Sequence, residues 1–177
     1  MRLAEHDVAV GDELVAELVV CLVHFVVGEG AVHGLVGEAV YLDDIVKRNH
    51  LEEMMQHVIM PGYIVNSDLP YIYNNAFAFL YTSLRESFGI PLLEAMACGT
   101  PVITSNTSSM PEIGGPEAIL INPENPDEIT DMMIRLEEDD EFYSQQKEIG
   151  LVRAEQFSWK QTAEHLLDLY EKVYKQR

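Results

Sequence analysis

The apolar residues of this chain form short runs that alternate with longer helical patterns. Phe77 to Tyr81 is apolar and aromatic and stops at the polar pair Thr82 and Ser83, which is typical of a buried strand. Pro101 to Thr104 and Ala118 to Ile121 are two further short runs of this kind. Because helical segments separate the runs and no hairpin turn signal joins them, the pattern predicts an α/β domain with a mostly parallel, Rossmann-like sheet flanked by helices.

The predicted helices begin at residues whose side chains can accept hydrogen bonds from the first backbone N–H groups. The expected caps are Ser67, Ser109, Asn125 and Ser158. The main helices are expected over Asp68 to Asn75, Pro126 to Leu136 and Asp140 to Glu155. In the last helix, Trp159, Ala163, Leu166, Tyr170 and Val173 recur at helical spacing. This apolar stripe is expected to pack in the core.

The segment after the predicted strand Phe77 to Tyr81 is expected to be a loop that leads into a helix. Glu86 to Ile90 form the loop, and Pro91 suits the first turn because it lacks a backbone N–H and has a fixed φ. Leu92 to Cys98 are good helix formers, and Gly99 suits the residue that follows a helix end. Because a helix N-terminus carries unpaired N–H groups and partial positive charge, an anion such as phosphate is expected over Ser87 to Ile90.

Two carboxylates and one glycine give this loop its candidate chemistry. Gly89 has no Cβ, so the backbone can approach a ligand closely there. Glu94 is expected near the first turn and Glu86 just before it, and carboxylates accept directed hydrogen bonds from sugar or ribose hydroxyls. Alternatively, Glu94 is a first-turn acid favoured by the helix dipole and Glu86 a solvated loop residue. Local physics leaves both interpretations open.

Composition excludes several classes of partner. The 177 residues fit one domain of 1–177, and the formal net charge of −19 argues against nucleic acid or an anionic membrane, which need a basic surface. The two cysteines form no disulfide framework, which indicates a cytoplasmic protein, and the histidines and cysteines show no metal-ligand spacing. Leu14 to Val27 is apolar but contains Glu17 and His24 and is too short to span a bilayer, so no transmembrane segment is predicted.

The run ESFGIPLLEAMACGTPV, residues 86–102, closely resembles the donor-site signature of glycosyltransferase family 4, also called glycosyltransferase group 1. The preceding Pro61 to Ile64 and the following Pro111 to Gly115 and Ile121 to Pro123 are also similar to that family. The resemblance extends from about His57 to the C-terminus. In the family the final helix crosses towards the other domain, so the resemblance implies that part of its apolar stripe is exposed here.

The resemblance implies the C-terminal half of a GT-B fold and transfer of a sugar, with retention of configuration, from a UDP-, GDP- or ADP-linked donor. Glu86 would be catalytic, because it would bind the transferred sugar and stabilise positive charge at its anomeric carbon. Glu94 would bind the ribose hydroxyls, and backbone N–H groups near the helix start would bind sugar and phosphates without a metal or other cofactor. The implied donor-binding residues are Ser87, Phe88, Gly89, Ile90, Pro91, Leu93 and Glu94, with Tyr63 and Ile64 against the nucleobase.

Residues 1–46 do not resemble the family in the same way. Arg2 is the only base among them, although family members carry an Arg and a Lys that clamp the donor pyrophosphate. The hypothesis is that this end is truncated or non-native. The N-terminal acceptor domain is also expected to be missing, so the isolated chain should have little or no transferase activity. Two alternatives are a nucleotide-sugar binding module without chemistry and a glycoside hydrolase that uses Glu86 and Glu94.

Overall fold

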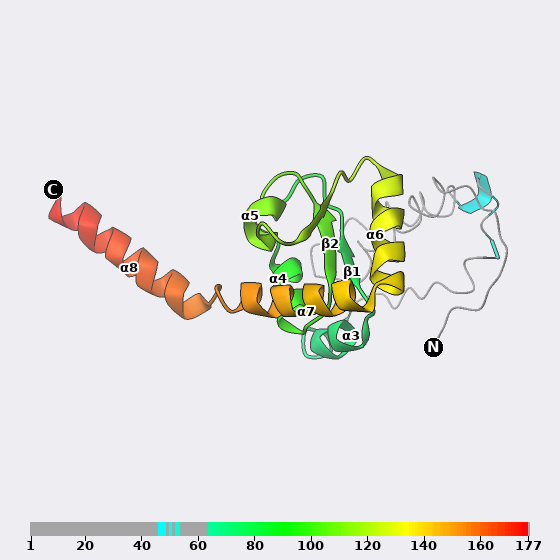
Figure 1. Ribbon diagram of the computed structural model, residues 1–177. Coiled ribbons are helices and arrows are strands. Elements are labelled where there is room, and N and C mark those ends of the chain that lie inside the picture. The colour runs from blue at the N-terminus through cyan, green and yellow to red at the C-terminus, as the bar shows by residue number, and fades with distance from the viewer. Residues whose placement is uncertain (1–45, 49, 51, 54–63, 177) are drawn as a thin grey trace.

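The computed structural model describes residues 46–48, 50, 52–53 and 64–176. Within them a small parallel sheet is covered by helices, as Figure 1 shows. Strands β1 (Phe79–Tyr81), β2 (Val102–Ser105) and β3 (Ile119–Ile121) lie in the order β1-β2-β3, with Phe79 opposite Val102 and Ile103 opposite Ile119. The predicted α/β architecture and the parallel direction of these strands are confirmed. A further short strand, which the sequence predicts over His57 to Met60, lies outside the described residues.

One face of the sheet is covered by α3 (Leu69–Asn75), α4 (Ile90–Ala97) and α5 (Met110–Gly114). Phe79 and Val102 point to this face, where they join one buried cluster with side chains of the three helices. The helix residues in that cluster are Leu69, Tyr73, Leu92, Ala95, Met96, Met110 and Ile113. Successive strand residues point to opposite faces, so each strand is apolar on both sides.

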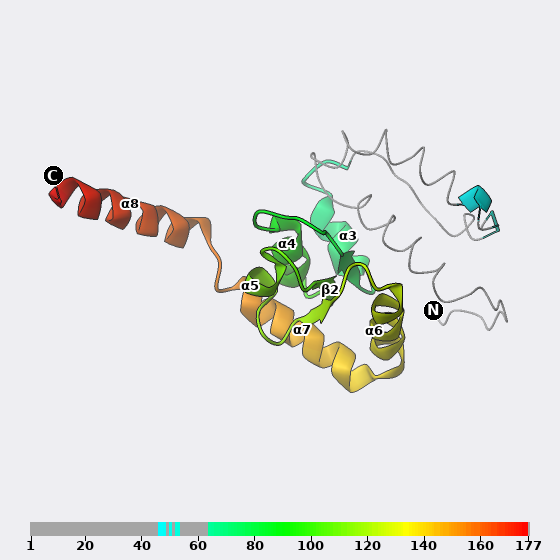
Figure 2. The ribbon, with the colours of Figure 1, turned by 90° about the horizontal axis from the view of Figure 1, so that it is seen from above.

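The other face is covered by α6 (Pro126–Glu138). Leu80 and Ile103 point to this face, and Ile129 and Leu136 of α6 pack on them with full burial. Helix α7 (Asp140–Ala154) then crosses from α6 to α4, as Figure 2 shows from above. The two helices are close at Gly150, where an added Cβ would lie 3.4 Å from Met96 Cγ, in ordinary van der Waals contact.

Two of the four predicted caps are confirmed. Asn125 accepts a hydrogen bond from the Asp127 N–H, and Ser158 accepts one from the Gln161 N–H. The cap predicted at Ser67 is wrong, because α3 begins one residue later, after Asp68. The capping box predicted at Ser109 is also wrong, because that hydroxyl donates to the backbone of the loop before α4 instead.

The last helix, α8 (Trp159–Lys175), does not join the core. It extends away from the sheet and its covering helices in Figures 1 and 2, and none of its residues is buried. Trp159 is 80% exposed. The expectation that the apolar stripe of this helix packs in the core is therefore wrong, and the exposure implied for part of the stripe applies to all of it. The chain turns away after α7, so the stripe faces solvent.

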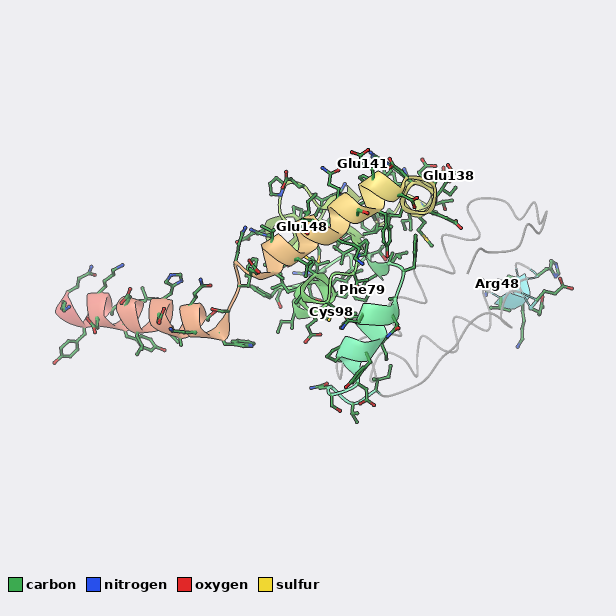
Figure 3. All side chains as sticks on the ribbon, turned by 60° about the horizontal axis from the view of Figure 1, so that its bottom comes forward. Arg48, Phe79, Cys98, Glu138, Glu141 and Glu148 are labelled. Carbon is green, nitrogen blue, oxygen red and sulfur yellow. The ribbon has the colours of Figure 1, made fainter. Side chains whose placement is uncertain are left out.

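Acidic side chains of α6 and α7 face outward. Figure 3 labels Glu138, Glu141 and Glu148 on the outer side of these helices, and all three are exposed. Charges at such positions remain hydrated, so they carry the negative net charge without a desolvation cost. Phe79 and Cys98 lie in the interior in the same view, within or against the cluster under α4.

Truncating α4 where it faces the sheet should destabilise the domain. Leu92 is 0% exposed, so Leu92→Ala should lower the free energy of unfolding by about 2 to 5 kcal/mol, measured by urea denaturation. Leu167→Ala on α8 is the matched control, because Leu167 is 63% exposed and its loss should change stability by less than about 0.5 kcal/mol. An equal cost for the two substitutions would contradict the packing described.

Candidate functional site

The candidate site lies where β1 ends and α4 begins. Gly89 connects the loop to α4 with φ +100°, a left-handed conformation that side chains rarely adopt. A Cβ on Gly89 would lie 2.4 Å from the terminal methyl of Met110, so the space beside the glycine is filled by α5. The positive φ is therefore what requires a glycine here, because the Met110 methyl is the flexible end of a side chain. The sequence had indicated only the close approach of a ligand there.

The Glu86 carboxylate is held on both oxygens. The Tyr81 hydroxyl donates a 2.7 Å hydrogen bond to Oε2, and the Ser87 N–H donates a 2.9 Å bond to Oε1. These donors, with the Tyr81 hydroxyl acting most strongly, lower the pKa of Glu86 although partial burial opposes them. The Ser87 N–H, expected to contact the donor, is thus used by Glu86 itself.

The backbone of Glu86 is held as firmly as its side chain. The Glu86 N–H donates to Ser108 Oγ at 3.1 Å, and the same hydroxyl donates to the Glu86 carbonyl at 2.6 Å. Ser109 Oγ donates to that carbonyl at 3.0 Å. Ser108 has φ +58°, which is uncommon for a residue with a side chain and is retained where the surroundings enforce it. The loop after β2 thus fixes the position of Glu86.

Glu94 is the fifth residue of α4, so it lies beyond the first turn. The alternative of a first-turn acid is therefore wrong, whereas the expected position near the first turn is confirmed. The helix starts at Ile90 rather than at Pro91. The Tyr73 hydroxyl donates a 3.4 Å hydrogen bond to Glu94 Oε2. Partial burial raises the pKa of Glu94, and the bond from Tyr73 opposes this only in part.

The two tyrosines that bind the two glutamates belong to one set of stacked rings. Tyr73 meets Phe79 edge to face with ring centroids 5.3 Å apart, and Phe79 stacks on Tyr81 at 5.8 Å. We call Tyr73, Phe79 and Tyr81 the aromatic ladder. Burial, with the adjacent carboxylates, raises the pKa of both tyrosines far above the ordinary value, so both hydroxyls stay protonated as donors.

A groove of about 560 Å³ lies beside this site. Four predicted donor-binding residues line it: Phe88, Ile90, Leu93 and Glu94. Its other wall comes from the end of α7 and the start of α8, including Phe157 and Trp159. Phe88 meets the Phe157 ring edge to face at 6.0 Å. The groove thus combines aromatic and aliphatic walls with a single carboxylate, which suits a ligand with one apolar and one hydroxyl-bearing part.

The remaining predicted residues are placed as follows. Pro91 is half-buried in the first turn of α4, Ser87 is exposed, and Ile64 packs half-buried against the cluster under α4. Tyr63 lies outside the described residues. The structure thus brings Phe88, Ile90, Leu93 and Glu94 together in one groove, with Glu86 and Ser87 in the adjoining loop.

Sequence reasoning missed the residues that hold the two glutamates. These are Tyr73, Tyr81, Ser108 and Ser109. Tyr73 and Ser108 lie 21 and 22 residues from their glutamates, and no local spacing rule links positions that far apart. The cluster of hydroxyl residues after β2 was a usable signal, because such clusters bind the neighbouring backbone.

Neither a metal site nor a membrane span is found in the described part of the chain. No group of three His, Cys, Asp or Glu side chains there could hold a metal ion. None of the described helices is long and apolar enough to cross a membrane. The absence of a metal or other cofactor in the chemistry and the cytoplasmic location stay predictions.

A parallel sheet with polar ligand-type residues beyond its strand ends is the binding arrangement of Rossmann-like α/β domains. The chain belongs to the family described as glycosyl transferases group 1, whose sequence profile matches residues 26–153. It is 36% identical over 126 residues to the O-antigen chain mannosyltransferase B of Escherichia coli, covering 71% of this chain and 32% of that protein. It is also 36% identical over 104 residues to the D-inositol 3-phosphate glycosyltransferase of Corynebacterium jeikeium, covering 58% of this chain and 25% of that protein.

Solved structures confirm the fold. The sucrose-phosphate synthase of Thermosynechococcus elongatus matches with a TM-score of 0.69 and 26% identity, over 80% of this chain and 35% of that one. Anabaena HepE, solved in complex with UDP and glucose, matches with a TM-score of 0.66 and 24% identity. The match covers 77% of this chain and 38% of that one. The predicted Rossmann-like half of a GT-B fold is confirmed. The chain spans about a third of the length of these matched structures.

The two glutamates should affect stability with opposite dependence on pH. The lowered pKa of Glu86 means that its stabilising contribution is present above its ordinary pKa and is lost as the pH falls through the folded-state value. The raised pKa of Glu94 means that its contribution is present below its ordinary pKa and is lost as the pH rises through the folded-state value.

Unfolding free energies measured between pH 3 and pH 7 test this. Glu86→Gln should cost stability at pH 7 and progressively less towards pH 3. Glu94→Gln, which mimics the neutral acid and keeps an acceptor for Tyr73, should be neutral or stabilising at pH 7. The same pH dependence for both variants would contradict the two environments.

Proposed function

We propose that this chain is the donor-binding part of a retaining glycosyltransferase of family 4, which transfers a sugar from a nucleotide-sugar to an acceptor. One observation carries the proposal. Two carboxylates, each fixed by a tyrosine hydroxyl, flank the N-terminus of α4, with Glu94 at the edge of a groove of about 560 Å³. Family membership supports the reaction class, and the geometry supports a role for each residue.

In this proposal Glu86 is the residue closest to the chemistry. Its lowered pKa keeps the carboxylate ionised at neutral pH, so it can accept hydrogen bonds from sugar hydroxyls. The same negative charge would stabilise positive charge that develops at the anomeric carbon as the leaving phosphate departs. In this proposal the substrate hydroxyls bind the carboxylate alongside the donors that Tyr81, Ser87 and Phe88 supply.

Glu94 and α4 would bind the nucleoside diphosphate part of the donor. Glu94 faces the groove and would accept the ribose hydroxyls, while the apolar walls from Phe88 and Ile90 would contact the sugar or the base. The start of α4 carries no acidic residue in its first turn, so its partial positive charge is free to attract the phosphates. This arrangement would stabilise the leaving group without a metal.

The acceptor would bind to a second domain outside this chain. The match to the Escherichia coli mannosyltransferase covers 32% of that protein's length, which supports this proposal. We therefore expect that the chain binds the donor but shows little transfer by itself. A module that binds nucleotide-sugars without chemistry is the alternative, and it would gain no turnover when the remaining domain is supplied.

A glycoside hydrolase is the other alternative. The opposite pKa shifts of the two glutamates are what an acid and a nucleophile need. Such a pair must also face one cleft from its two sides. Glu94 lines the groove and Glu86 does not, so the geometry favours transfer. Release of free sugar from an aryl glycoside by the chain would reverse this choice.

Calorimetry with UDP, GDP, ADP and their sugar conjugates tests the proposal. We expect saturable binding of one nucleotide and a weakening of about tenfold or more in Glu94→Ala, because a hydrogen-bonded charged group is removed. Glu138→Ala is the control, because Glu138 is an exposed acid on α6 away from the groove. If no nucleotide binds to the folded chain, or if both variants bind equally, the proposed donor site is wrong.

A further inference from the structure

The aromatic ladder connects the two signature carboxylates, although its residues lie outside the signature. Tyr81 is the last residue of β1 and Tyr73 lies in α3, with Phe79 between their rings. One hydroxyl binds Glu86 at 2.7 Å and the other binds Glu94 at 3.4 Å. Two glutamates that lie eight positions apart in sequence are thus contacted by one set of stacked rings.

The ladder is itself fixed by β2 and by the turn that precedes it. Thr100 Oγ1 donates to the Tyr73 carbonyl at 2.6 Å, and Thr104 Oγ1 donates to the Tyr81 carbonyl at 2.8 Å. Tyr73 is 1% exposed and Phe79 4% exposed, so the core holds these two rings, and the half-buried Tyr81 ring stacks on Phe79. A hydroxyl held this way imposes its own position on the flexible carboxylate that it contacts.

We propose that Tyr81 and Tyr73 are positioning residues, with Tyr81 orienting Glu86 towards the transferred sugar and Tyr73 orienting Glu94 towards the nucleotide. This assignment rests on the proposed function of the two glutamates. Because both tyrosines stay protonated, each acts only as a donor and never competes for the proton of its glutamate. The shorter bond gives Tyr81 the larger effect.

Tyr81→Phe and Tyr73→Phe separate the two roles, because each removes one hydroxyl and keeps the ring. In Tyr81→Phe the affinity for the nucleotide-sugar should fall about five- to tenfold, while affinity for the bare nucleotide should change less than about twofold. Tyr73→Phe should lower the affinity for the nucleotide and for the nucleotide-sugar by the same factor, which should be smaller than that of Tyr81→Phe. Tyr143→Phe is the control, because its hydroxyl bonds the Phe77 carbonyl outside the site and its loss should leave both affinities unchanged.

Two further measurements distinguish positioning from a structural role. The pKa of Glu86, followed by carboxyl ¹³C NMR and assigned with Glu86→Gln, should rise in Tyr81→Phe and stay constant in Tyr143→Phe. In a Glu86→Ala background, Tyr81→Phe should cause no additional loss of nucleotide-sugar affinity, because the residue through which it acts is gone.

The outcomes identify which claim fails. If the wild-type chain binds the nucleotide-sugar but Tyr81→Phe binds it equally well, the positioning role is wrong and the proposed function stands. An equal loss for nucleotide and nucleotide-sugar, with an unchanged Glu86 pKa, would mean that Tyr81 only supports the fold and would also overturn the inference. If the wild-type chain binds neither ligand, the proposed function fails and the positioning role fails with it.

Discussion

The geometry of this domain depends on how the chain passes from β1 into α4. Gly89 permits a left-handed turn there, and Met110 fills the space that a side chain would need. The carboxyl end of a parallel strand and the N-terminus of the following helix are thereby brought to one edge of the sheet. This turn places the start of α4, while Tyr81, Ser108 and Ser109 hold Glu86 and the segment between α7 and α8 forms the other wall of the groove.

The two glutamates differ although they belong to one sequence run. Glu86 lies among donors, so its carboxylate is ionised and fixed, whereas Glu94 lies against Tyr73 and the groove wall with a raised pKa. Burial dominates at Glu94 and raises its pKa, whereas the hydrogen bond from Tyr81 dominates at Glu86 and lowers its pKa. A fixed anion near a sugar and a less strongly held acid near a ribose are consistent with the roles proposed for them.

The sequence predicted the sheet, α4, α6 and α7, because short apolar runs and proline or asparagine at helix starts are local signals. It also identified Glu86 and Glu94. It did not predict Tyr81 or Ser108 as partners of Glu86. Ser108 lies 22 residues away, and Tyr81 lies five residues away across a strand end and a loop, for which no regular spacing rule exists. The stripe of α8 was assigned to the core by periodicity, which shows that a helix has an apolar face but not what covers that face.

Amide chemical-shift mapping on the ¹⁵N-labelled chain, titrated with UDP-, GDP- and ADP-sugars, tests the central claim most directly. The account predicts that one donor shifts the amides from Ser87 to Leu93, except that of Pro91, together with those of Tyr81 and Glu94. It predicts no change around the separate hollow of about 330 Å³ beside Gly115 and Glu148. Shifts confined to that hollow, or to the outer face of α6, would contradict the assignment of the donor site to the start of α4.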